Sequence, residues 1–166
     1  MYRIKKGDFF IMDIYTVSFF GHREIEWSTE IEERLDDLLY DLITKKEYVE
    51  FLIGRDGAFD ILASSVIRKA VKNYSSGNTA FVLVLPYMRA DYRDNQQNFL
   101  NYYDEVEICE ESSAVHFKSA IQVRNRYMID RSNLVVCCIQ HKNGGAYRTV
   151  QYAVKQKHKI INIAEE

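Results

Sequence analysis

Two adjacent glycines beside a helical pattern are the feature of this chain that points most directly to chemistry. Asn143, Gly144 and Gly145 follow an apolar run at residues 134–139 and precede a helical pattern at residues 150–157. Adjacent glycines let the backbone approach a ligand closely, and the free amides of a helix start attract an anion such as phosphate. The motif therefore predicts an anion-binding turn. The alternative is that a turn between a strand and a helix uses glycine for its geometry alone.

A second glycine turn, at Gly21, is followed by three groups that could carry chemistry. Arg23 offers the planar set of donors that binds phosphate, and a surface ion pair with Glu24 or Glu26 is its alternative role. His22 is either a hydrogen-bonding group and proton donor at a site or a packed, satisfied side chain. His22 and Glu24 are therefore candidates for acid–base catalysis.

A third glycine turn contains Gly54 and Gly57, and Asp60 follows in the expected first turn of the next helix. In that position Asp60 either caps backbone amides or binds ribose hydroxyls, and it is a further candidate acid or base. Three glycine turns, each after a strand-like run, together predict a pocket for a nucleotide or a nucleotide-derived ligand.

The helical pattern at residues 114–130 carries Arg124 and Asn125, which could form a hydrogen-bonding pair at a ligand. Met128 lies four residues after Arg124 and therefore shares its helix face. We predict that this face contributes to the ligand site, and a solvated helix face is the alternative. Thr149, after the paired glycines, either caps its helix or contacts phosphate.

Composition and charge narrow the possible functions. The chain has 22 Lys and Arg against 24 Asp and Glu, so it lacks the basic excess that non-specific nucleic-acid or anionic-membrane binding needs. No apolar run is long enough to span a bilayer, and the basic N-terminus lacks a signal-peptide core, so we predict a cytoplasmic protein. The four scattered histidines predict no metal site. The three cysteines are expected to be buried free thiols, with a redox or metal role as the alternative.

Strand-like and helix-like segments alternate along the chain and must position these groups. Apolar or β-branched runs predict strands at residues 13–20, 49–53, 80–85, 105–109, 134–139 and 159–163. This alternation predicts an α/β fold, a single Rossmann-like, doubly wound and mostly parallel sheet with helices on both faces. Ligands of such sheets bind beyond the carboxyl ends of the strands, where all three glycine turns fall.

The domain is expected to cover residues 13–166. Residues 1–12 are predicted to be an N-terminal extension and a candidate for a dispensable segment. Residues 87–104 are polar and aromatic, and we expect a loop there with one short helix. The standard dinucleotide fingerprint, the P-loop and the serine-nucleophile elbow are all absent from the sequence.

Taken in order, these segments resemble the SLOG superfamily, the Smf/DprA and LOG group, and especially its YpsA-like branch of small bacterial and phage-associated proteins. The resembling segments are residues 19–24, 54–60, 124–129 with Ser132, 144–145 and 159–163. Each motif alone is weak, but their order and spacing are fairly specific. The resemblance covers nearly everything from Asp13 onward and implies a Rossmann-like sheet with a pocket for nucleotides or their derivatives.

The LOG enzymes are phosphoribohydrolases that cleave nucleoside monophosphates. Their Arg-Lys pair followed by Met corresponds to Arg124, Asn125 and Met128, so the Lys is replaced by Asn in this chain. Their catalytic Glu falls on Gln151 or, with a shift of one residue, on Tyr152. Because cleavage of an N-glycosidic bond usually needs a carboxylate, this departure argues against a LOG-type hydrolase.

The sequence therefore favours a cytoplasmic binding or sensor domain for an ADP-ribose-like or other nucleotide-derived ligand, with no other cofactor. One alternative is a nucleotide N-glycosidase that uses His22, Glu24 or Asp60 in place of the missing Glu. Another is a protein-interaction module with a vestigial pocket, which would contact its partner through residues 87–104. Neither a membrane partner nor a strong nucleic-acid signal is expected, and a homo-oligomer is compatible with the fold.

Overall fold

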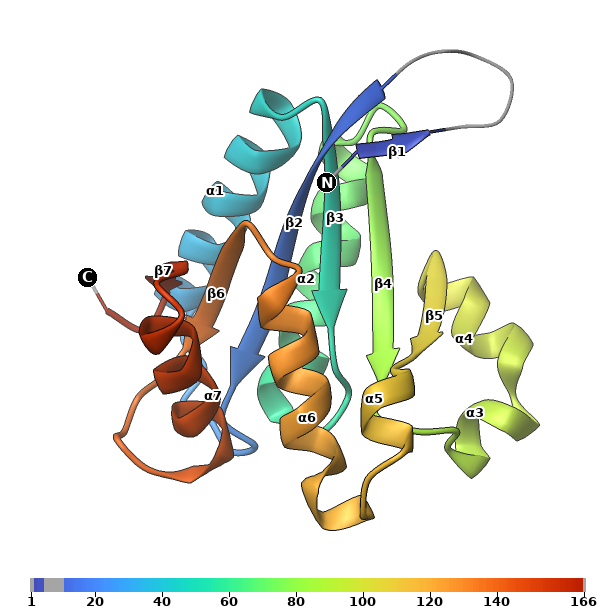
Figure 1. Cartoon of the computed structure of the whole chain (residues 1–166). Coiled ribbons are helices and arrows are strands. Elements are labelled where there is room, and N and C mark those ends of the chain that lie inside the picture. The colour runs from blue at the N-terminus through green and yellow to red at the C-terminus, as the bar shows by residue number, and fades with distance from the viewer. Residues whose placement is uncertain (1, 5–10, 166) are drawn as a thin grey trace.

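The computed structural model describes residues 2–4 and 11–165, which form a central sheet with helices on both faces (Figure 1). The strand order is β5-β4-β3-β2-β6-β7, and these strands all pair in parallel. The strands are β1 (Tyr2–Ile4), β2 (Ile11–Gly21), β3 (Tyr48–Ile53), β4 (Thr79–Leu85), β5 (Glu105–Ile108), β6 (Leu134–Cys138) and β7 (Lys159–Asn162). The predicted Rossmann-like α/β fold is confirmed.

The helices lie in two layers. They are α1 (Thr29–Lys45), α2 (Ala58–Tyr74), α3 (Ala90–Asp94), α4 (Gln96–Tyr102), α5 (Glu110–Ser113), α6 (Phe117–Asp130) and α7 (Gly144–Lys155). Helices α1 and α2 cover one face of the sheet, and α6 and α7 cover the other (Figure 1). Because the central strands are covered on both sides, they are continuously apolar rather than alternating.

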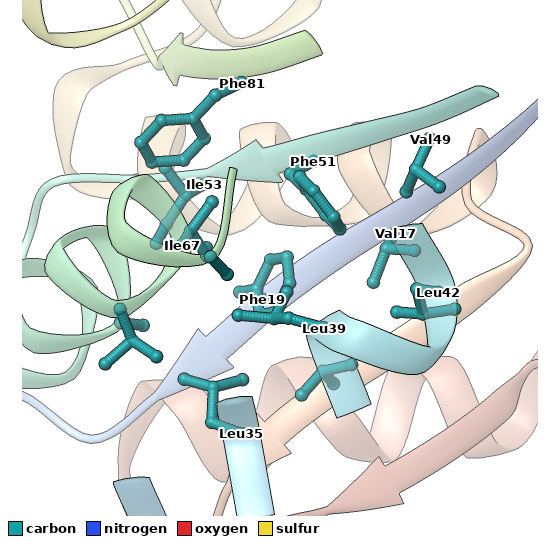
Figure 2. Packing of buried hydrophobic residues seen from close by; sticks show 14 of the residues in the cluster. Val17, Phe19, Leu35, Leu39, Leu42, Val49, Phe51, Ile53, Ile67 and Phe81 are labelled. Carbon is teal, nitrogen blue, oxygen red and sulfur yellow. The ribbon is translucent and has the colours of Figure 1, made fainter. Parts of the chain in front are cut away.

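Successive residues of β3 show how the two cores are divided. Phe51 packs on the side of α1 and α2, where its ring centroid lies 5.9 Å from that of Phe19, in the cluster that also contains Leu35 of α1 (Figure 2). The next residue, Leu52, points to the opposite face and packs in the cluster that contains Met128 of α6. Alternation along the strand therefore anchors both helical layers to the same backbone.

Helix α1 begins at Thr29, because Ser28 is its N-cap and accepts a hydrogen bond from the Ile31 amide at 3.2 Å. Strand β2 begins at Ile11, two residues earlier than expected, and pairs antiparallel with β1. The predicted extension at residues 1–12 thus overlaps both strands, while residues 5–10 of it lie outside the described part of the chain. That this extension is dispensable stays a prediction.

Three other boundaries differ from expectation. Helix α7 begins at Gly144, so the paired glycines form its first turn instead of a turn before it. Helix α6 begins at Phe117, because His116 caps it and separates it from α5. Residues 87–104 contain two helices instead of one, and Phe99 of α4 is buried in the core.

The buried free thiols predicted from the sequence are confirmed for Cys109, Cys137 and Cys138. Burial raises the pKa of Cys137 to about 12 and that of Cys138 to about 11, so neither thiol is a reactive thiolate at neutral pH. None of the helices in the described part of the chain is long and apolar enough to cross a membrane.

Candidate functional site

A cavity of about 560 Å³ opens at the carboxyl ends of β2 and β3, beside the first turns of α2 and α7. Its volume lies within the range typical of small-molecule sites. All three glycine turns meet in it. The predicted site residues that line the cavity are Gly21, His22, Arg23, Glu24, Gly54, Gly57, Asp60, Arg124, Asn125, Gly144 and Gly145.

Three predicted site residues do not line the cavity. Met128 is fully buried against the sheet, because the helix face that it shares with Arg124 points into the core. Thr149 is also buried, and its hydroxyl accepts a hydrogen bond from Asn125 Nδ2 at 3.0 Å. Asn143 is exposed at the N-cap of α7 and makes no side-chain capping bond. Thr149 therefore does not reach the cavity but binds Asn125, which lines it.

Sequence reasoning missed several residues of the cavity, notably Asp56, Lys118, Gln122, His141 and Arg148. Asp56 lies inside a motif that was singled out, but a residue between two glycines resembles an ordinary turn residue. Lys118 and Arg148 carry no local signal beyond their charge. His141 reaches the site only through contact with a residue 119 positions away.

Two of the glycine turns pack against each other. A Cβ atom on Gly57 would lie 2.6 Å from the Cα atom of Arg23, and the Ala58 amide donates to the Arg23 carbonyl at 2.9 Å. A Cβ atom on Gly21 would lie 2.2 Å from the ring of Phe59. These two glycines are therefore explained by close packing of protein on protein, without a ligand.

Arg124 is locked into the wall of the cavity and is only 2% exposed. Its guanidinium donates to Asn125 Oδ1 at 2.9 Å, to the Val84 carbonyl at 2.6 Å and to Asp56 Oδ2 at 2.6 Å. The other oxygen of Asp56 accepts from Arg89 at 3.1 Å. The charge of Arg124 is thus neutralised within the protein, and its main role in the structure is to hold the β3–α2 turn and α6 together.

Asp60 lies in the first turn of α2, as predicted, and its carboxyl group has two different environments. Its Oδ2 atom accepts the backbone amide of Asp56 at 2.8 Å, while Oδ1 has no hydrogen-bond partner among the described residues. Desolvation raises the pKa of Asp60 from 3.8 to about 6, although the Asp56 amide and the charge of Arg124 oppose this rise. One carboxylate oxygen is therefore anchored, and the other is available at the cavity.

His22 and His141 form a stacked pair at the cavity wall. Their ring centroids are 3.6 Å apart with an interplanar angle of 12°, and His22 is 5% exposed. The backbone amide of His141 donates to His22 Nε2 at 3.4 Å. Desolvation, with a further effect of the charge of His141, lowers the pKa of His22. The His22 ring is therefore neutral at neutral pH, with its proton on Nδ1.

Three exposed cations, Arg23, Lys118 and Arg148, surround the cavity. Among the described residues, no carboxylate lies within ion-pair distance of any of them. The surface ion pair considered for Arg23 is thus not formed with Glu24. Unpaired cations around a concave surface raise the local concentration of anions.

The start of α7 supplies a second attraction for anions. Gly144 adopts a φ of +87°, a left-handed conformation that glycine tolerates, and no atom lies within 4 Å of where its Cβ would be. Because the Asn143 side chain does not cap the helix, the first amides of α7 are left for solvent or a ligand. Gly144, Gly145 and Ala146 all line the cavity.

The positions that correspond to the LOG catalytic Glu lie outside the cavity. Gln151 is exposed, and the hydroxyl of Tyr152 donates to Asp130 at 2.7 Å. The carboxylates that do line the cavity are Glu24, Asp56 and Asp60. In the part of the chain that the structure describes, no group of three or more potential metal ligands occurs.

Solved structures of other proteins share the fold of this chain. No protein-family model matches the chain, and no curated protein matches it. DNA processing protein A from Helicobacter pylori, described for its single-stranded DNA binding mode, superposes with a TM-score of 0.59 at 15% identity over 88% of this chain. DNA processing protein A (DprA) from Streptococcus pneumoniae superposes with a TM-score of 0.57 at 13% identity over 89% of this chain.

The chain spans 63% of the Helicobacter protein and 49% of the Streptococcus protein. At these identities the likeness concerns the fold alone. The chain therefore has the Rossmann-like fold found in DprA (Smf) proteins, whose domain of this type belongs to the SLOG superfamily.

Proposed function

We propose that this chain is a binding or sensor domain whose cavity takes a phosphorylated, nucleotide-derived small molecule. The observation that carries the proposal is the uncapped start of α7, which borders a cavity surrounded by the unpaired cations Arg23, Lys118 and Arg148. A helix start and unpaired cations are the groups that proteins use for phosphate. Because Arg124 already pairs with Asp56, we assign it a supporting role.

The remaining lining suits the rest of such a ligand. Phe19, Phe20 and Ile121 contribute apolar surface, while Gln122 and Asn125 contribute amide groups. A mixture of apolar walls and a few polar groups is typical of pockets that bind small organic molecules. These features favour a ligand with an organic body as well as a phosphate.

The proposal is tested by measuring thermal stability and heats of binding with AMP, NAD, ADP-ribose and cyclic dinucleotides. A ligand that binds only the native state at about 100 times its Kd stabilises it by about 2.7 kcal/mol. The double variant Arg23→Ala, Arg148→Ala should lose this effect. Lys72→Ala, which changes an exposed cation at the far end of α2, should keep it. No stabilisation by any of these compounds would refute the proposal.

Gly145→Val isolates the helix start. A Cβ atom at Gly145 would meet only the end of the flexible Gln122 amide, at 3.1 Å, so the fold should tolerate the change. The branched side chain should cover the amides of α7 and reduce affinity for every phosphorylated ligand. Gly145→Ala serves as the matched control, because its single methyl group should leave most of the binding. Unchanged affinity in folded Gly145→Val would remove the helix start from the site.

A nucleotide N-glycosidase is the second candidate function, and the environment of the Asp60 carboxyl group supports it. A carboxyl group with a pKa of about 6 and one unoccupied oxygen at a cavity has the properties of a general acid or base. Chromatography of the same incubations would detect released base or ribose phosphate. In this case Asp60→Asn should abolish product formation, and cleavage that survives the substitution would exclude Asp60 from the mechanism.

An interaction module is favoured by one surface feature. Tyr87, Met88 and Leu100, all within residues 87–104, are exposed apolar side chains. Single-stranded DNA belongs in the ligand panel as well, because the Helicobacter protein with this fold is described for binding it. A pull-down with Met88→Ser, Leu100→Ser as the matched variant would test the protein partner. Capture that is equal for wild type and variant would exclude this surface.

A further inference from the structure

We infer that Asp60 binds the sugar hydroxyls of the ligand, so that the cavity selects ribonucleotides over their 2′-deoxy counterparts. This inference rests on the proposed function and adds to it the chemical class of the ligand. It starts from an asymmetry within a single carboxylate of the cavity lining, in which Oδ2 accepts a hydrogen bond from the Asp56 amide at 2.8 Å and Oδ1 has no partner among the described residues.

An ionised carboxylate only accepts hydrogen bonds, so its open oxygen must face a donor on the ligand. Phosphate would be repelled there, which leaves hydroxyl or amino groups. Asp60 is also held in place, since it belongs to the first turn of α2 and its other oxygen is anchored to the turn before that helix. A fixed acceptor can discriminate between ligands that have a hydroxyl and those that lack it.

The other carboxylates near the cavity are less suited to this role. Asp56 accepts Arg89 through one oxygen and Arg124 through the other, at 3.1 and 2.6 Å. Glu24 is exposed on a turn, and no hydrogen bond or ion pair with another described residue fixes its orientation. Asp60 therefore combines a fixed position with a free acceptor.

The strand order places Asp60 at the correct side of the phosphate site. Strands β3 and β6 flank β2, so α2 and α7, which follow them on opposite faces of the sheet, begin on either side of the carboxyl end of β2, and the first turns of both line the cavity. A ligand whose phosphate lies at the start of α7 would direct its adjoining sugar across β2, toward Asp60.

Isothermal titration calorimetry with matched nucleotide pairs tests the inference. The probes are the four ribonucleoside 5′-diphosphates and their 2′-deoxy counterparts, with inorganic phosphate as a probe for the anion site alone. A hydrogen bond from a hydroxyl to a charged acceptor predicts about tenfold to hundredfold tighter binding of the ribonucleotides by the wild-type protein. Phosphate itself should bind equally to wild type and to Asp60→Asn.

Asp60→Asn tests the residue as well as the ligand. Its amide oxygen can still accept the Asp56 amide, so the NH₂ group, which cannot accept a hydroxyl proton, should face the cavity. The preference for ribonucleotides should then fall to near unity. The control Asp37→Asn, an exposed acid on α1, should keep the wild-type preference. The wild-type preference for ribonucleotides should also be lower at pH 5 than at pH 7. At pH 5, below its pKa of about 6, the Asp60 carboxyl is mostly protonated and is a weaker acceptor.

The outcomes separate the inference from the proposed function. Equal affinity of the wild-type protein for ribonucleotides and deoxyribonucleotides would overturn the inference and leave the phosphate site standing. A preference that persists in Asp60→Asn would assign the hydroxyl to another residue. Failure of every nucleotide and of phosphate to bind would remove both. If Asp60→Asn did not fold, the wild-type comparison with 2′-deoxy nucleotides would still decide.

Discussion

Replacing Asp60 with Asn should make the protein more stable at neutral pH, although the substitution removes a hydrogen-bonded carboxylate. Desolvation raises the pKa of this group from 3.8 to about 6 in the folded state. The folded protein therefore binds the proton more tightly than the unfolded chain does. By linkage, the free energy of unfolding falls as the pH rises from about 4 to about 6, and the whole cost is present above that window.

The size of the effect follows from the same pKa values. Each unit of pKa difference corresponds to about 1.36 kcal/mol, so the ionised carboxyl costs the folded state about 3 kcal/mol at pH 7. An Asn side chain avoids this cost, and the pKa of about 6 already includes the effect of the hydrogen bond from the Asp56 amide, so nothing further is subtracted. We expect a net gain of about 3 kcal/mol, or a rise in Tm of about 6–12 °C for a chain of this size.

Urea unfolding followed by circular dichroism between pH 4 and pH 8 measures this directly. The stabilities of the wild type and Asp60→Asn should converge near pH 4, where the wild-type carboxyl is protonated in the folded state, and separate as the pH rises. Asp37→Asn, which changes an exposed acid, should follow the wild type throughout. A variant less stable than the wild type at pH 7, or a difference independent of pH, would refute the assignment of Asp60 as a desolvated carboxylate.

Three further substitutions test how the site is built. Arg124→Met should cost about 3–5 kcal/mol in urea unfolding, because it leaves Asp56 Oδ2 and the buried Val84 carbonyl without their donor. A loss below about 1 kcal/mol would contradict the role of Arg124 in holding the β3–α2 turn and α6 together. Gly21→Ala should lower the Tm, since its Cβ would lie 2.2 Å from the Phe59 ring and overpacking costs about 1–3 kcal/mol. An unchanged Tm would mean that Gly21 is not in close contact with Phe59 of α2. Ser28→Ala should cost about 1 kcal/mol of unfolding free energy through loss of the α1 cap, and equal midpoints in urea would argue against that cap.

The fold was predictable because the central strands are covered on both faces. Each then appears in the sequence as a short, continuously apolar run, as in residues 80–85, all of which are buried. Helix starts were less predictable. Gly144 and Gly145 have poor helix propensity, yet they form the first turn of α7, where the amide groups have no intrahelical partner in any case.

The site was predictable only where local sequence determines it. The glycine turns and Asp60 were found because each follows a strand-like run. The pairing of Asp56 with Arg124, by contrast, joins residues 68 positions apart, and topology alone brings them together. Helical spacing correctly put Met128 on the same face as Arg124, but spacing does not tell which face is turned to the sheet.

Several groups that line the cavity lower the stability of the folded protein when no ligand is bound. Asp60 is ionised despite its desolvation, and Asn143 makes no side-chain capping bond at the start of α7. Within the described part of the chain, Arg23 and Arg148 have no carboxylate partner. A ligand with hydroxyls and a phosphate would offset all of these costs at once, whereas a purely structural role for Asp60 would offset none. We therefore expect Asp60→Asn to raise the free energy of unfolding and, at the same time, to abolish the preference for ribonucleotides. A structural carboxylate would lose stability and leave that preference unchanged, so the pair of results separates the two roles.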